Sequence, residues 1–155
     1  MTDSPDFAIL LAAAYRALVD RLLAEMERAG IHGMRPAYGF VIRALAAESP
    51  NVNRLAQLLG VSKQAASKLA DEMERAGFLE RFPDASDRRQ TRLRPSRSGR
   101  KVVARALATS AAIEGELRRR LGRRDVEGLR RALLLFVERH GGLEDVLARR
   151  ARPVW

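Results

Sequence analysis

The chain of 155 residues carries 29 Lys and Arg against 19 Asp and Glu, which gives a formal charge of +10. It has no cysteine and only two histidines, so a disulfide framework or thiolate metal site is excluded, and we expect neither a metal nor a cofactor. The longest apolar run, residues 7–15, is far shorter than the ~20 residues of a membrane span, and no basic leader precedes it. These features predict a soluble, cytoplasmic protein of one domain, with or without an oligomerisation arm, and with no membrane partner.

The first third of the chain predicts two helices. Ser4 suits an N-cap and Pro5 suits the first helical position, and apolar residues then recur at helical spacing until Gly30. After a loop, a second helix is expected over about residues 36–48, where a Ser-Pro pair ends it.

The next segment predicts a helix-turn-helix. Asn53 can cap a short third helix that Gly60 ends, and Ser62 can cap a fourth helix that ends at Gly77. Only the tripeptide 60–62 separates the two helices, and such a short turn is typical of the motif.

A β-hairpin and two more helices are expected to follow. Residues 78–82 and 91–94 have strand-like patterns and flank a polar, Arg-rich turn. Ser96 can cap a fifth helix that reaches about residue 121, a sixth should cover about 126–140, and a short helical piece is expected after the glycines at 141–142. The predicted fold is mainly α with a small β-hairpin wing, that is, a winged helix-turn-helix.

The fourth predicted helix has the pattern of a DNA-reading helix. Its apolar residues share one face at the i, i+3, i+4 and i+7 positions, namely Ala66, Leu69, Ala70 and Met73. The outward face of its N-terminal half carries cations, an amide and a hydroxyl, which can contact bases and phosphates: Lys63, Gln64, Ser67 and Lys68. An ordinary amphipathic surface helix would show the same phase, so this alternative stays open.

The hairpin tip carries Asp87, Arg88 and Arg89. An arginine on a narrow hairpin can enter the minor groove of DNA, and we expect Asp87 to hold the Arg89 side chain by a charge-assisted hydrogen bond. A solvated loop with a weak ion pair is the alternative.

With these motifs, residues 51–100 resemble the DNA-binding core of the MarR family of bacterial transcriptional regulators. The likeness lies in residues 55–67, 74–81, 84–89 and 96–100, and the aspartate–arginine hairpin string at 84–89 is its most specific part. Pro95 departs from the family pattern, so we expect a shortened second strand.

The resemblance implies a homodimer that binds a pseudo-palindromic operator in double-stranded DNA, usually to repress transcription. It divides the chain into an N-terminal dimerisation helix (1–34), a winged helix-turn-helix (35–98), and a long helix with C-terminal dimerisation helices (99–155). It also implies a small aromatic or anionic effector bound between the dimerisation helices and the DNA-binding lobe. The candidate lining residues are Tyr15, His32, Met34, Arg35, Tyr38 and Phe40. The alternative is that these aromatic residues only fill the core.

Two segments hold most of the positive charge. Residues 81–100 and residues 118–131 each contain seven Arg and two acidic residues, a net charge of +5. The charge of the first cluster is typical of a segment that binds a polyanion. We expect the arginines of the second cluster to be solvated or to form ion pairs between subunits. A non-specific basic nucleic-acid-binding or architectural protein is the alternative function. An enzyme is not expected, because no nucleophile–base pair, phosphate loop or metal spacing occurs in the sequence.

Overall fold

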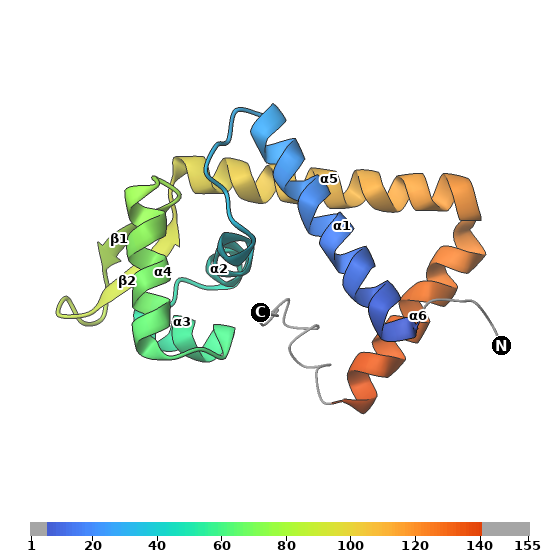
Figure 1. Ribbon diagram of the computed structural model, residues 1–155. Coiled ribbons are helices and arrows are strands. Elements are labelled where there is room, and N and C mark those ends of the chain that lie inside the picture. The colour runs from blue at the N-terminus through green and yellow to red at the C-terminus, as the bar shows by residue number, and fades with distance from the viewer. Residues whose placement is uncertain (1–5, 141–155) are drawn as a thin grey trace.

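The computed structural model describes residues 6–140 (Figure 1). In chain order its elements are α1 (Phe7–Arg28), α2 (Pro36–Ala47), α3 (Val52–Leu59), α4 (Lys63–Arg75), β1 (Leu79–Pro83), β2 (Thr91–Pro95), α5 (Arg97–Leu121) and α6 (Arg123–Arg139). The mainly helical fold with a hairpin wing is confirmed. The predicted cap at Ser4, the proline at Pro5 and the helical piece after residue 142 lie outside the described residues.

The helix starts differ from the sequence predictions at three places. Helix α1 begins at Phe7, two residues after the predicted start, and the Asp6 Oδ1 caps it by accepting from the Ala8 N–H at 2.7 Å. Asn51, not Asn53, caps α3, because the Asn51 Oδ1 accepts a hydrogen bond from the Arg54 N–H at 2.8 Å. The earlier start makes Val52 helical and lets it pack against the core. Helix α6 begins at Arg123, three residues before the predicted position, because Gly122 adopts a positive φ of 85° and turns the chain directly from α5 into α6.

The winged-helix lobe contains α2, α3, α4 and the hairpin around one hydrophobic core. Gly60 takes the left-handed conformation between α3 and α4, at a φ of 65°, as its position in the turn requires. Leu55, Met73 and Leu93 are among the largest fully buried side chains, so α3, α4 and β2 all contribute to the same core. The outward face of α4 is therefore held on a rigid support.

The two strands pair antiparallel over their whole length, with Leu79 opposite Pro95 and Pro83 opposite Thr91. The expected shortening of β2 is wrong, because Pro95 belongs to the strand and pairs at its very end. Proline is tolerated at this position, and the next residue continues the connection, since the Ser96 N–H donates to the Phe78 oxygen at 3.0 Å.

The long helices extend away from this lobe. Helix α5 runs from the wing to α6, and α1 packs across α5 (Figure 1). Large apolar side chains remain exposed on α1 and α6, namely Phe7, Ile9, Leu10, Leu129, Leu133, Leu134, Leu135 and Phe136. The described part of a single chain therefore leaves two apolar helix faces without cover.

Ion pairs fix these long helices to one another. Glu114 on α5 pairs with Arg130 on α6 at 2.8 Å, and Arg21 on α1 pairs with Glu116 on α5 at 2.8 Å. The hydrogen bond from Arg130 lowers the pKa of Glu114. Arg118 also pairs with Glu114, at 2.6 Å. Part of the second arginine cluster thus forms ion pairs within the chain, rather than the solvated or intersubunit contacts that the sequence suggested.

The start of α5 is packed so closely against the wing that only glycine fits at one position. A Cβ on Gly99 would lie 2.0 Å from the backbone oxygen of Phe78. We expect Gly99→Ala to lower the free energy of unfolding by about 1–3 kcal/mol, as overpacking does. Gly115→Ala in the same helix is the control: its Cβ would meet only the Arg119 side chain, at 3.5 Å, and alanine should stabilise the helix by about 0.5–1 kcal/mol. Chemical denaturation of both variants measures the difference, and equal stabilities would contradict the packing argument.

Candidate nucleic-acid interface

The N-terminal half of α4 presents a polar surface to solvent. Lys63, Gln64 and Lys68 are exposed and Ser67 is partly exposed. Ala66, Ala70 and Met73 on the opposite face are fully buried and Leu69 is partly buried. The Ser62 Oγ caps the helix by accepting from the Ala65 N–H at 3.1 Å. The four predicted contact residues therefore point away from the core, on the first two turns of a capped helix.

The acidic residues of α4 lie in its second half and have basic partners. Arg81 on β1 pairs with Asp71 at 2.5 Å and with Glu74 at 2.9 Å. Arg35, in the loop before α2, pairs with Glu72 at 3.3 Å. The carboxylates are thus compensated inside the lobe, and the N-terminal half of the helix keeps its positive charge.

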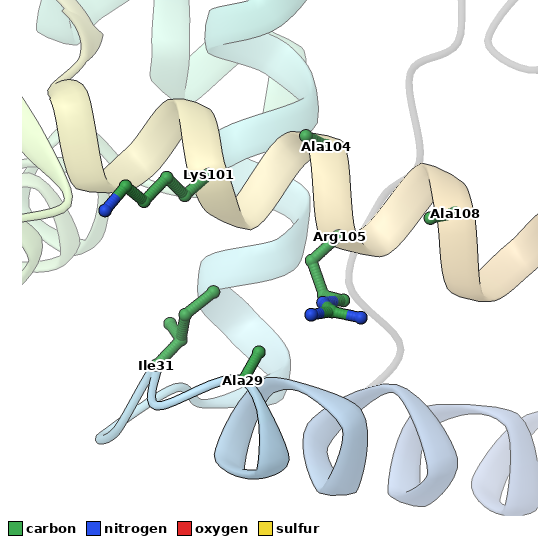
Figure 2. A pocket seen from close by; sticks show the side chains of 6 residues that line it. All are labelled: Ala29, Ile31, Lys101, Ala104, Arg105 and Ala108. Atoms are coloured by element: carbon green, nitrogen blue, oxygen red, sulfur yellow. The ribbon is translucent and has the colours of Figure 1, made fainter.

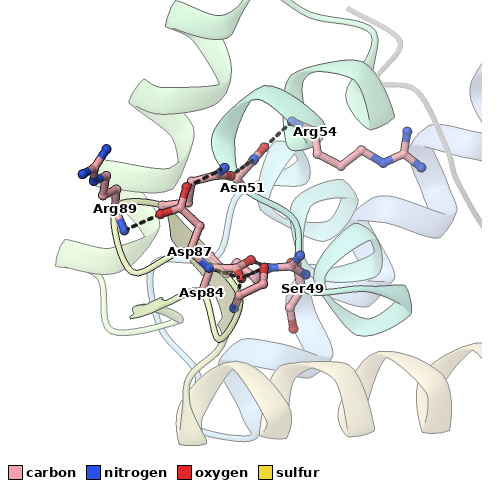
Figure 3. Close-up of polar contacts among 9 residues, drawn as sticks. Ser49, Asn51, Arg54, Asp84, Asp87 and Arg89 are labelled. Atoms are coloured by element: carbon pink, nitrogen blue, oxygen red, sulfur yellow. Dashed lines mark hydrogen bonds and ion pairs between the residues drawn. The ribbon is translucent and has the colours of Figure 1, made fainter.

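A buried carboxylate organises the wing loop (Figure 3). Asp84 is only 6% exposed, and it accepts hydrogen bonds from the Ser86 hydroxyl at 2.5 Å and from the Ser86 N–H at 2.7 Å. It also pairs with Arg92, which donates in turn to the Ser49 oxygen at 3.1 Å. These hydrogen bonds, first that of the Ser86 hydroxyl and then that of Arg92, hold the pKa of Asp84 far below its usual range. The sequence analysis included Asp84 in the hairpin string but assigned it no role.

Asp87 has a different role from the predicted one. Its Oδ1 accepts from the backbone N–H of Arg89 at 3.0 Å, and its Oδ2 accepts from the Gln90 side chain at 3.3 Å. The expectation that Asp87 holds the Arg89 side chain is therefore wrong. An Asx-type turn satisfies the backbone first, because the carboxylate is only two residues away.

Five of the seven arginines of the first cluster belong to the hairpin, and these five fall into two groups. Arg81, Arg92 and Arg94 pair with acidic side chains. Arg88 and Arg89 are exposed at the wing tip, and their guanidinium groups make no hydrogen bond or ion pair within residues 6–140. The tip therefore carries two uncompensated positive charges on a loop whose backbone is fixed.

The structure does not gather the six predicted effector residues into one cavity. Tyr38 is only 3% exposed and packs edge-on against Phe78, so it belongs to the core and cannot line an open cleft. Arg35 lies over the Tyr38 ring at 5.8 Å, and His32 Nδ1 is 2.6 Å from a Glu27 carboxylate oxygen.

The other three predicted effector residues are also dispersed. Met34 and Phe40 are partly buried against the core, whereas Tyr15 is exposed on α1. The alternative that these aromatics fill the core thus describes Tyr38 and Phe40.

A hollow of about 400 Å³ lies instead between the end of α1 and α5 (Figure 2). Its lining combines apolar groups with two cations, namely Ala29, Ile31, Lys101, Ala104, Arg105 and Ala108. The sequence analysis missed all six. The available signal was on α5, where positions 101, 104, 105 and 108 share one helix face and alternate small apolar residues with cations.

The described part of the chain contains neither a candidate membrane span nor a metal-ligand cluster. Over residues 6–140, no helix combines the length and the apolar character needed to cross a bilayer. In the same residues, no three His, Asp or Glu side chains come together as metal ligands would.

The lowered pKa of Asp84 predicts a pH dependence of stability. A carboxylate whose folded-state pKa is depressed stabilises the fold above its unfolded value, about 3.9, and this stabilisation is lost as the pH falls below it. We expect Asp84→Asn to lower the melting temperature at pH 7, and the difference from the parent to shrink towards pH 3. Thermal unfolding at fixed protein concentration measures this. An equal difference at both pH values would show that the charge of Asp84 is unimportant.

Comparison with known proteins agrees with this geometry. Residues 32–90 match the family model described as MarR family. No curated protein sequence matches the chain significantly. Among solved structures, RV1404 from Mycobacterium tuberculosis superposes with a TM-score of 0.69 at 23% identity, covering 89% of this chain and 97% of its own.

Two similar structures contain DNA. The transcriptional repressor CouR, bound to a 23-mer DNA duplex, superposes with a TM-score of 0.66 at 25% identity, covering 85% of this chain and 92% of its own. The MepR–DNA complex from S. aureus gives a TM-score of 0.67 at 19% identity, covering 87% and 98%. Residues 32–90 thus match the MarR family, and the chain has the winged helix-turn-helix fold of these structures, which agrees with the resemblance seen in its sequence.

Proposed function

We propose that the chain is a sequence-specific DNA-binding transcriptional regulator, a repressor that binds a pseudo-palindromic operator as a homodimer. The observation that carries the proposal is the distribution of charge on the winged-helix lobe. The acids of α4 and the buried Asp84 of the wing have basic partners. Lys63 and Lys68 on α4 and Arg88 and Arg89 on the wing keep their positive charge exposed.

The two elements suit different grooves of the same duplex. The N-terminal half of α4 can enter the major groove, where the Gln64 amide can pair with an adenine edge and Ser67 can reach several bases. The wing is narrow enough for the Arg89 guanidinium to enter the adjacent minor groove. CouR and MepR, which have a similar fold, are bound to DNA in their structures, and this supports DNA as the partner.

The uncovered apolar faces of α1 and α6 supply a dimer interface. Phe136 is 50% exposed and Phe7 is 61% exposed, and such side chains at both ends of the described chain would be buried by a second copy. A two-fold dimer would place its two α4 helices about one DNA turn, ~34 Å, apart. Binding to the chromosome also places the protein in the cytoplasm.

The effector component of the proposal concerns the hollow between α1 and α5. Lys101 and Arg105 offer two positive charges beside apolar groups, which suits a small aromatic carboxylate. A ligand here would contact both α1, which carries part of the proposed dimer interface, and α5, which leads into the wing. Its binding could then favour a dimer geometry that does not fit the operator.

The DNA-contact residues can be tested by substitution. We expect Arg89→Ala, and separately the double change Gln64→Ala with Ser67→Ala, to weaken operator binding about fivefold or more, because a good base contact contributes about 1–3 kcal/mol. Fluorescence anisotropy at fixed salt measures this, with an operator selected from fragments of the source genome. Both variants should sediment as dimers of the 17.3 kDa chain.

Arg124→Ala is the control, since it removes the same charge from an exposed position at the start of α6. Parental affinity in both wing and α4 variants would show that these residues are wrongly assigned. Equal binding of operator and random duplex by the parent, with a steep salt dependence, would favour the non-specific basic protein instead.

The effector site can be tested with benzoate. In excess it should stabilise the parent by about 1–3 kcal/mol and release the operator. The double variant Lys101→Ala with Arg105→Ala should lose both effects, and Arg119→Ala on the same helix should keep them. Thermal shift and anisotropy measure the two effects. An unchanged response of the double variant would place any benzoate site elsewhere.

A further inference from the structure

Side-chain hydrogen bonds connect the start of α3 to the wing tip (Figure 3). The Asn51 Nδ2 donates to the Gln90 Oε1 at 3.3 Å, and the Gln90 Nε2 donates to the Asp87 Oδ2 at 3.3 Å. The other Asp87 oxygen accepts from the Arg89 N–H at 3.0 Å. The four residues form one continuous chain of donors and acceptors, and each amide uses both its ends, because the Asn51 Oδ1 also caps α3.

This connection acts where the hairpin has least support. A two-stranded hairpin is at best marginally stable alone, so its orientation depends on contacts with the lobe. In the middle of β2 the Leu93 N–H donates to the Pro50 oxygen at 2.9 Å and the Leu93 side chain is fully buried. Nearer the tip, Asn51 and Gln90 provide a link between the loop and the helix-turn-helix.

We propose that Asn51 and Gln90 are positioning residues, which fix the wing tip relative to the helix-turn-helix so that Arg89 and α4 reach the same DNA site together. The inference rests on the proposed DNA binding and deepens it. A tip that moves independently of α4 must be ordered when DNA binds, and this ordering lowers the affinity. The hydrogen-bonded link provides that order in the free protein.

Asn51→Asp separates the linking role of Asn51 from its capping role. Aspartate caps a helix as well as asparagine does, so α3 should form normally. The variant has no Nδ2 donor, however, and Gln90 would face two carboxylates, those of residue 51 and Asp87, with a single NH₂ group. Asn53→Asp is the matched control, because it adds the same charge to the first turn of α3 at an exposed side chain that makes no hydrogen bond within residues 6–140.

The first measurement needs no DNA. The N–H groups of Asp84 and Gln90 donate across the wing loop at 2.9 Å, to the oxygens of Gln90 and Asp87, and NMR can follow their hydrogen exchange. We expect exchange about fivefold faster in Asn51→Asp than in the parent, the effect of losing one modest hydrogen bond. Asn53→Asp should match the parent. Equal exchange in all three proteins would overturn the link.

The second measurement is operator affinity in a double-mutant cycle. Asn51→Asp should bind about fivefold more weakly than Asn53→Asp. In a Gln90→Ala background the two variants should bind equally, because the link is already absent. A difference that persists there would mean that Asn51 acts on DNA by itself and would overturn the proposal. If the parent fails to prefer operator over random duplex, the proposed function fails, while the exchange result still decides the link.

Discussion

The pairing of acids with a subset of arginines is the interaction on which the rest of this molecule depends. Asp84 takes Arg92, and the carboxylates of α4 take Arg81 and Arg35. A single surface ion pair contributes little to stability, but these pairs determine which cations stay free to bind a partner. The net charge of the chain therefore says less about its partner than the few guanidinium and ammonium groups that remain uncompensated on one lobe.

A second constraint on the structure is the close packing at the start of α5, which holds this helix against the winged-helix lobe. Gly99 lies against the Phe78 backbone, and the Ser96 hydroxyl donates to the Gly77 oxygen at 2.5 Å. The end of α4, the wing and α5 thus meet at one dense junction. Because α5 also carries the contacts with α1 and α6, this junction joins the long helices to the lobe through residues that have little room to deform.

Much of this fold could be predicted from local signals. Glycines and capping side chains give the C-terminal end of α1 and both ends of α4 and α5 closely, because capping is a property of adjacent residues. Asn53 was predicted to cap α3, but Asn51 caps it, and the earlier start lets Val52 pack on the core. Local pattern also placed the polar face of α4 outward.

Features that depend on contacts between distant segments could not be predicted in the same way. The Asp87 carboxylate can accept a hydrogen bond from either the backbone N–H or the side chain of Arg89, and the sequence does not decide between these two donors. The hollow beside Lys101 and Arg105 exists only because the end of α1 crosses α5. Tyr38 was a candidate ligand contact because the resemblance implies an effector site nearby, yet its ring packs against Phe78, far along the chain.

The backbone hydrogen bond from Arg89 to Asp87 has a consequence for how this protein would search a chromosome. It immobilises the main chain of the tip but leaves the long Arg89 side chain free to rotate. In the proposed binding mode, the Arg89 side chain can enter minor grooves of different width without a change in the loop. It loses rotamer entropy when it binds. A fixed backbone with a mobile side chain would tolerate variation in the DNA sequence beneath the wing. Stricter discrimination between DNA sequences would then fall to α4.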